Sequence, residues 1–258
     1  MLDIKQIESF YPEYLRSFKQ NLLREYFQYK ILEIIFDSKW GKGLSFIGGT
    51  AIRIVHSHTR FSEDLDFDNL ALNKRDFAQL AELIQTKLSM EGYSVEIKNV
   101  FKGAFRSYIR ISNILFESGL TGHKQKKILI QVDTEPQGFH YQPEKVILNK
   151  FDVFLQINVV PADILLSQKI YAVFKRKRAM GRDFYDIVFL LGRTRPNSEY
   201  LKLKLKIENM AALNSKILSE CRKFNFKQLT KDVEQSLFFP GDAKKILLFE
   251  EYIKNYKF

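Results

Sequence analysis

Three aspartates at alternate positions, Asp64, Asp66 and Asp68, are the residues of this chain best suited to chemistry. Their alternation with Leu65 and Phe67 has a period of two, which is typical of a β-strand with one polar and one apolar face. Neighbouring carboxylates on such a face lie about 6–7 Å apart. Like charges this close are unfavourable unless a cation or a proton neutralises them. We therefore expect Asp64 and Asp66 to bind a divalent metal ion and Asp68 to be a strand-end residue; the alternative is an edge strand with solvated carboxylates.

A glycine turn precedes these acids, because Gly48, Gly49 and Thr50 follow a short apolar run, and Gly49 lies 15 residues before Asp64. A helix is predicted over 51–57, so the turn offers backbone N–H groups and the positive end of a helix dipole to a phosphate. Thr50 would cap this helix, donate its hydroxyl to a phosphate, or both. The alternative is that the glycines only mark a strand-to-helix joint. Phosphate-binding turn and paired carboxylates together suit metal-assisted phosphoryl or nucleotidyl transfer.

The rest of the chain predicts an α+β core to about residue 160 and a helical domain after it. Hydrophobic spacing predicts one or two helices over 4–37 and a helix from Asn73 to Met90. Further strands are expected from alternating or apolar runs at 44–47, 93–97, 105–111, 127–133 and 151–160. Pro161 can occupy the first turn of a helix, and the sequence beyond it is helical in pattern.

Composition restricts the partners and the compartment of the protein. Lysine and arginine exceed acidic residues by 41 to 30 in 258 residues, for a net charge of +11. This excess favours a polyanionic partner such as RNA, DNA or a nucleotide, although it also serves solubility alone. The single cysteine, Cys221, excludes an intramolecular disulfide. No signal segment is recognised at the N-terminus, and the longest apolar run is too short to span a membrane, so we expect a cytoplasmic protein without a membrane partner.

Two sequence segments together resemble a known family. FIGGTAIRIVHSHTRFSEDLDFD (46–68) is similar to the Gly-Gly turn and Asp-x-Asp pair of the nucleotidyltransferase superfamily, and more narrowly to the AbiEii/AbiGii toxin nucleotidyltransferases, which include the MenT toxins. DILLSQKIYAVFKRKRAMGRDFYDIVFLL (163–191) is similar to the downstream signature of that class. The resemblance implies an α+β fold: a polymerase-β-like nucleotidyltransferase core, with a mixed sheet flanked by helices, over 1–160, and a C-terminal helical domain over 161–258 that completes the nucleotide site.

The resemblance also implies an activity and its partners. The chain would be a nucleotidyltransferase that uses Mg²⁺ or Mn²⁺ to transfer NMP from an NTP to an acceptor hydroxyl. The acceptor would be RNA, such as the 3′ end of tRNA, and the biology that of a toxin encoded beside a protein antitoxin. Two alternatives remain open: a nucleotide- or nucleic-acid-binding protein on this fold with little transferase activity, and a phosphotransferase that acts on protein.

Further site residues follow from the same resemblance. Lys169 has apolar neighbours three and four positions away, and an ammonium so placed is paired or reaches to solvent; the family gives it a triphosphate as partner and a catalytic role. Ser62, in the approach to Asp64, would help to bind the nucleotide. Asp133 would be a third metal ligand, and the alternative is a strand-end aspartate that begins a turn.

Two aspartates in the second signature complete the set of candidate site residues. The resemblance gives Asp186 a catalytic or site-organising role, and Asp183 a role as helix cap and in the nucleotide site. The alternative is that Asp183 is only an N-cap and that Asp186, three residues on, only gains from the helix dipole. Arg53 and Arg60 are expected either to touch phosphates or to form structural ion pairs. His56 and His58 lack metal-ligand spacing and are interpreted as surface residues.

Overall fold

A computed structural model of the chain describes residues 2–256, which form two compact units. The first, here called the sheet unit, comprises the described residues up to 55 and residues 62–160. The second, here called the helical unit, comprises residues 161–256 together with the short segment 56–61. The sequence analysis assigns that segment to the core, whereas in the structure it packs with the helices.

The sheet unit is built on a seven-stranded mixed sheet with the strand order β3-β4-β5-β2-β1-β7-β6. Strands β1 and β7 and strands β2 and β5 pair in parallel, and the other neighbours pair antiparallel. The strands are β1 (Leu44–Ile47), β2 (Leu65–Asn69), β3 (Ser94–Lys102), β4 (Ala104–Ser112), β5 (Ile128–Glu135), β6 (Glu144–Lys150) and β7 (Val153–Val159). The α+β class and the mixed sheet predicted from the sequence are confirmed.

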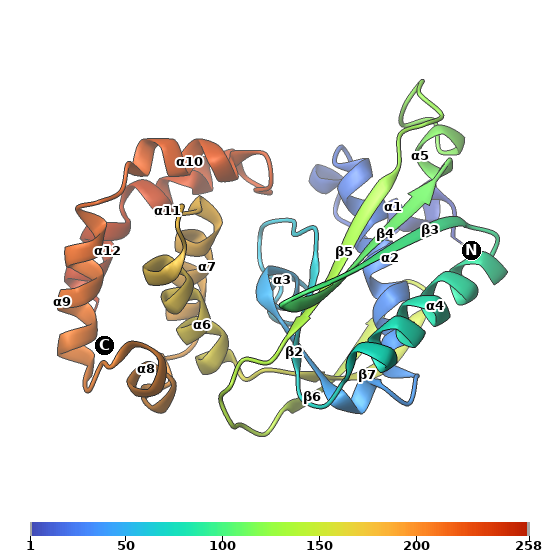
Figure 1. Cartoon of the computed structure of the whole chain (residues 1–258). Coiled ribbons are helices and arrows are strands. Elements are labelled where there is room, and N and C mark those ends of the chain that lie inside the picture. The colour runs from blue at the N-terminus through green and yellow to red at the C-terminus, as the bar shows by residue number, and fades with distance from the viewer. Residues whose placement is uncertain (1, 257–258) are drawn as a thin grey trace. The chain divides into compact units, whose positions relative to one another are not determined.

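The sheet unit also contains five α-helices within the described residues: α1 (Ile4–Ser9), α2 (Lys19–Phe36), α3 (Gly48–His56), α4 (Lys74–Met90) and α5 (Ile114–Glu117). Helix α2 packs on β5 and β7, and α4 packs on β3 and β4 (Figure 1). The apolar positions of the strands face these helices, so that Leu65 and Phe67 are at most 1% exposed. Each such buried side chain contributes about 1.5–3 kcal/mol of hydrophobic stabilisation.

Alternation along β2 and β5 then fixes the direction of the acids. Because Leu65 and Phe67 point into the core, Asp66 and Asp68 project from the opposite face of the sheet, and Asp64 directly precedes the strand. The same holds for Asp133, whose neighbours Val132 and Thr134 are buried. The packing of the sheet against its helices is therefore what presents the carboxylates on one face.

The helical unit consists of α6 (Ala162–Lys175), α7 (Gly181–Leu191), α8 (Ser198–Leu205), α9 (Met210–Cys221), α10 (Phe226–Glu234), α11 (Lys244–Leu247) and α12 (Phe249–Asn255). Phe184 is fully buried, and the rings of Phe224, Phe226 and Phe249 surround it with centroids 5.0–5.4 Å away. Edge-to-face contacts of this kind add to the hydrophobic gain of burial. Within residues 2–256, no helix has the length and apolar character needed to cross a membrane.

Candidate active site

Asp66 lies in the middle of a row of paired residues on the face of the sheet opposite Leu65 and Phe67. In the strand register it pairs with Asp133 of β5 on one side and with Ile47 of β1 on the other. Arg106 of β4 pairs with Asp133 in turn and extends the row. Asp64 directly precedes β2, two residues before Asp66. The sheet thus places Asp66 and Asp133 on one face, with Asp64 at the start of the same strand.

The glycine turn touches the Asp66 carboxylate. Gly48 directly follows β1 with a φ of +81°, a conformation that side chains other than glycine rarely adopt. A Cβ atom built on Gly48 would lie 2.3 Å from Asp66 Oδ2. Gly48 is therefore required twice, by its backbone conformation and by the space that the carboxylate occupies. The start of α3, which suits a phosphate, lies directly beside a carboxylate that suits a cation.

Replacement of Gly48 by alanine tests this contact. We expect Gly48→Ala to lose about 100-fold in transfer rate, because a displacement of Asp66 by about 1 Å has effects of this size. Gly92→Ala is the matched control, since Gly92 has a φ of +93° and open space around its Cβ position. Both variants carry the same backbone strain of about 1–3 kcal/mol. Similar activities for the two variants in a nucleotidyl-transfer assay, at similar melting temperatures, would show that the Gly48–Asp66 contact is unimportant.

Buried side chains hold the backbone that leads into Asp64. The Thr50 hydroxyl donates to the Asp64 carbonyl oxygen, and Gln28 Nε2 of helix α2 donates to the carbonyl oxygens of Ser62 and Glu63, each at 2.9 Å. Gln28 is 1% exposed and Thr50 is fully buried. Three consecutive carbonyl groups, 62 to 64, are thus fixed from inside the sheet unit. Gln28 was missed by the sequence analysis, because a lone glutamine in a helix carries no signal of its own.

The expectation that Thr50 caps the following helix is wrong. Helix α3 begins at Gly48, so Thr50 lies in its first turn and its hydroxyl bonds to the Asp64 carbonyl. The structure shows Thr50 in contact with the backbone of Asp64, directly before strand β2. Contact of Thr50 or Ser62 with a phosphate stays a prediction.

Asp133 is paired by side chains of β4 and β5. Both of its carboxylate oxygens accept from Arg106 Nε, at 2.9 and 3.0 Å, and one of them also accepts from Gln131 Nε2 at 2.9 Å. The hydrogen bond to Asp133 raises the pKa of Arg106. Among residues 2–256 no cluster of three His, Cys, Asp or Glu side chains is placed to hold a metal ion. The role of Asp133 as third metal ligand is a prediction that would require the Arg106 pair to open.

The donor set nevertheless fits Mg²⁺. This ion usually binds through one or two carboxylates, with water and substrate phosphates as its other ligands, rather than in a cage of protein side chains. Asp64 and Asp66 supply such a pair, and the absence of a side chain at Gly48 lets the Asp66 carboxylate lie against the start of α3. Asp68 is not a metal ligand, because its carboxylate already has other partners. It is 2% exposed and accepts hydrogen bonds from the Gln137 backbone amide and the Tyr141 hydroxyl, both at 2.8 Å. Asp68 is therefore a structural residue, as the sequence suggested.

Arg53 of helix α3 forms a structural ion pair with Glu25 of α2, at 2.9 Å between Nε and Oε2. Lys150 Nζ lies 2.8 Å from Glu25 Oε1, and the Tyr11 hydroxyl donates to the same oxygen at 2.8 Å. Burial alone would raise the pKa of Glu25, but the charges of Arg53 and Lys150 lower it below its usual value. These contacts tie helix α3, which begins with the glycine turn, to helix α2.

A second cluster of charges lies inside the helical unit and centres on Asp186, which is fully buried. Arg60 Nε and Nη2 donate to the two Asp186 oxygens, each at 2.7 Å, and Lys169 Nζ lies 2.8 Å from Oδ2. Although burial would raise its pKa, Arg60 and Lys169 hold the pKa of Asp186 well below its usual range. Asp186 thereby fastens the segment 56–61 to helices α6 and α7.

His58 belongs to the same cluster, so its interpretation as a surface residue is wrong. It is fully buried, between the rings of Tyr185 and Phe189 at centroid distances of 4.9 and 4.0 Å. Burial lowers the pKa of His58 to about 4, against the opposing effect of Asp186. The neutral ring accepts from the Thr59 amide at Nδ1, so Nε2 carries the hydrogen and donates to Asp186 Oδ1 at 3.0 Å.

Lys169 is 9% exposed, in agreement with the apolar neighbours seen in the sequence. Its ammonium lies 2.8 Å from Asp186 and 3.4 Å from Asp183. Asp183 also contacts Arg176 Nε at 3.3 Å. The proposed N-cap role of Asp183 is wrong, because helix α7 begins at Gly181 and Asp183 lies in its first turn. A nucleotide contact of Lys169 or Asp183 stays a prediction from the family.

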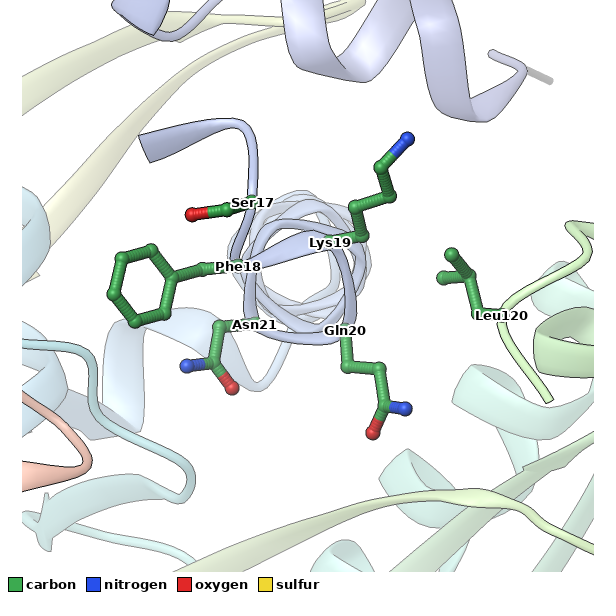
Figure 2. Close-up of a pocket in the computed structure, with 6 residues that line it drawn as sticks. All are labelled: Ser17, Phe18, Lys19, Gln20, Asn21 and Leu120. Carbon is green, nitrogen blue, oxygen red and sulfur yellow. The ribbon is translucent and has the colours of Figure 1, made fainter. Parts of the chain in front are cut away.

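Two surface pockets of the sheet unit are lined by residues other than the glycine turn and the aspartates at 64–68. One, of about 340 Å³, surrounds the start of helix α2 and is lined by Ser17, Phe18, Lys19, Gln20, Asn21 and Leu120 (Figure 2). The other, of about 310 Å³, is lined by residues of α2, α4 and their ends, including Glu33, Asp37 and Glu91. Neither includes a residue of the glycine turn or of the acid strand. The chemistry of the side chains, rather than the size of a pocket, identifies the candidate site.

A glycine turn that opens a helix beside a carboxylate on a mixed sheet is the arrangement that the sequence analysis expects of a nucleotidyltransferase. Comparison with known families and structures agrees. The sequence profile described as "Nucleotidyl transferase AbiEii toxin, Type IV TA system" matches residues 30–243. The chain therefore belongs to the AbiEii family of nucleotidyltransferase toxins of type IV toxin–antitoxin systems.

Solved structures of low sequence identity share the fold. JHP933 from Helicobacter pylori superposes with a TM-score of 0.55 at 16% identity, over 91% of each chain. A second H. pylori protein, described provisionally as a nucleotidyltransferase, gives 0.53 at 15% identity, over 92% of this chain and 97% of that one. No curated protein matches the chain. At such identities these neighbours support the fold alone.

Proposed function

We propose that this nucleotidyltransferase uses Mg²⁺ to transfer NMP from an NTP to a hydroxyl group of RNA, with the 3′ end of tRNA as the candidate acceptor. The observation that carries the proposal is the contact of Gly48 with the Asp66 carboxylate, which joins a phosphate-binding helix start to a cation-binding acid. The family assigns the enzyme class, and the proposal adds the metal, the donor and the acceptor.

In the proposed reaction the acceptor oxygen forms a bond to the α-phosphorus, the bond from that phosphorus to the bridging oxygen breaks, and pyrophosphate leaves. The hydroxyl proton passes to solvent. Asp64 and Asp66 hold the cation, which when bound neutralises phosphate charge and lowers the pKa of the acceptor hydroxyl. Gly48 and Gly49 present backbone N–H groups at the start of α3. The chain contributes mainly positioning and electrostatic stabilisation.

The cellular role is proposed on the same basis. As a member of a type IV toxin family, the protein would arrest growth by modifying its acceptor in the cytoplasm, and a protein antitoxin would counter it. A polyanionic acceptor also fits the net charge of +11.

Incubation of the pure protein with total tRNA, Mg²⁺ and each radiolabelled NTP tests the proposal. Label transferred to RNA from an α-labelled NTP, and none from a γ-labelled one, is the expected result. Label on the protein from a γ-labelled NTP would instead identify a phosphotransferase. Binding of NTP without any labelled product would identify a nucleotide-binding protein.

A further inference from the structure

The positive charge of this protein is concentrated in its C-terminal part. Residues 161–258 contain 20 lysines and arginines against 11 acidic residues, a net charge of +9. Residues 1–160 contain 21 against 19, a net charge of only +2. An even distribution would suit solubility alone, whereas this separation produces a field around one part of the molecule.

Part of this charge forms one basic surface, which we define as Lys175, Lys177, Arg178, Arg182, Lys227 and Lys231. All six side chains are exposed. They lie at the end of α6, on the loop between α6 and α7, at the start of α7, and on α10. These segments adjoin, because a Cβ on Gly181 would lie 1.9 Å from the Leu229 carbonyl oxygen and Arg178 pairs with Asp232 at 3.4 Å.

The basic surface is largely without internal counter-charge. Of its six members only Arg178 forms an ion pair within residues 2–256. Some exposed lysines elsewhere in the helical unit are paired, for example Lys202 with Glu208 and Lys245 with Asp242. Uncompensated charges of one sign on neighbouring segments repel each other. Binding of a polyanion removes this repulsion and also releases the counterions that were condensed on the polyanion.

We propose that this basic surface binds the phosphate backbone of an RNA; the identity of that RNA as the acceptor rests on the proposed function. RNA fits better than an acidic protein, because no large hydrophobic side chain is exposed in the stretches 175–182 and 226–234. Protein interfaces depend on buried aromatic or aliphatic anchors, whereas binding to nucleic acid is dominated by charge.

The salt dependence of tRNA binding tests the basic surface. The variant Lys175→Gln/Lys177→Gln/Lys231→Gln removes three exposed charges that have no ion pair. The control Lys124→Gln/Lys126→Gln/Lys145→Gln removes three charges from the sheet unit that are also exposed. Fluorescence anisotropy with labelled tRNA over a salt series should show, for the first variant only, a slope of log K against log[salt] reduced by about 2–3. The affinity at low salt should fall about 10–100-fold.

Each outcome decides a separate question. Equal slopes for the two variants would overturn the RNA surface even if the enzyme transfers nucleotides. Reduced tRNA binding in an enzyme that makes no labelled product would uphold the surface and count against the proposed function. Loss of binding to polyglutamate, with tRNA binding intact, would assign the surface to an acidic protein.

A different observation supports a second inference: we infer that Gln28 is a positioning residue for the metal-binding acid Asp64. Its buried amide donates to two successive carbonyl groups directly before Asp64, and Arg24, one turn earlier on α2, pairs with Glu63 at 2.7 Å. Helix α2 thus fixes the backbone from which Asp64 projects. The inference rests on the proposed metal role of Asp64.

Direct measurement of Mn²⁺ binding by EPR, without nucleotide, tests Gln28. Gln28→Met keeps the shape of the side chain but removes both hydrogen bonds, and we expect its Kd for Mn²⁺ to rise about 10-fold. Gln85→Met is the control, because Gln85 donates to the Val95 carbonyl at 2.9 Å in another part of the sheet unit. An unchanged Kd for Gln28→Met overturns the inference. Absence of Mn²⁺ binding by the wild type would instead count against the proposed metal site.

Discussion

Asp66→Asn should abolish nucleotidyl transfer and leave the protein as stable as before or slightly more stable. Amide oxygen is a poor substitute for carboxylate at a divalent cation, and we expect a loss of about 10³-fold, or ~4 kcal/mol of transition-state stabilisation. Stability should not fall, because Asp66 lies in register beside Asp133 and two residues from Asp64, so the change removes repulsion between carboxylates. The assay is transfer of α-labelled NTP to tRNA, with thermal unfolding measured on the same samples.

Asp68→Asn is the matched control, with the opposite expected result. Asp68 projects from the same face of the sheet two residues later, but its oxygens accept from Gln137 and Tyr141. Loss of its charge weakens two hydrogen bonds to a buried carboxylate, at a cost of about 1–3 kcal/mol of unfolding free energy, and transfer should continue. An active Asp66→Asn enzyme with a lowered melting temperature would show that Asp66 is structural and that the proposed site is wrong.

The pattern of the sequence was sufficient to predict strand β2, which carries Asp66, but not all of the elements around it. Alternation at 64–68 predicts which residues face the core, and the burial of Leu65 and Phe67 confirms it. Strand β6 was missed, because Val146, Ile147 and Leu148 are consecutive and show no alternation. The start of α3 was predicted three residues late, because glycines are interpreted as breakers even where they begin a helix.

Buried polar residues are where prediction from one sequence fails most. Glu25, Gln28 and Lys30 are polar residues of a kind that a surface helix usually exposes, yet all three are buried, since helix α2 is covered on most of its circumference. His58 and Arg60 meet Asp186, a residue more than 120 positions away, and no local pattern encodes such a pairing. The one sequence feature that could have revealed this pairing is a charged residue directly before the acidic motif. The sequence analysis noted Arg60 for this reason but did not find its partner.

The Asp186 cluster should dominate the stability of the helical unit. Asp186→Asn leaves Arg60 and Lys169 buried without their shared counter-charge, and removal of one partner from a buried pair costs about 3–5 kcal/mol. The only tryptophan, Trp40, belongs to the sheet unit, so its fluorescence reports that unit, whereas far-UV circular dichroism is weighted toward the helical unit. In urea unfolding, the dichroism transition should shift while the fluorescence transition moves less. A loss below about 1 kcal/mol would show that the cluster does not hold this unit together.

The comparison with Arg60→Gln separates an organising role of Asp186 from a direct catalytic one. Segment 56–61 connects helix α3 to the strand that carries Asp64 and Asp66, and Arg60 is held by both Asp186 oxygens. If Asp186 acts through this segment, Arg60→Gln and Asp186→Asn should lose transfer activity to a similar degree, and the double variant should lose little more than either. If the Asp186→Asn enzyme is inactive while the Arg60→Gln enzyme is active, the Asp186 carboxylate acts on the reaction directly.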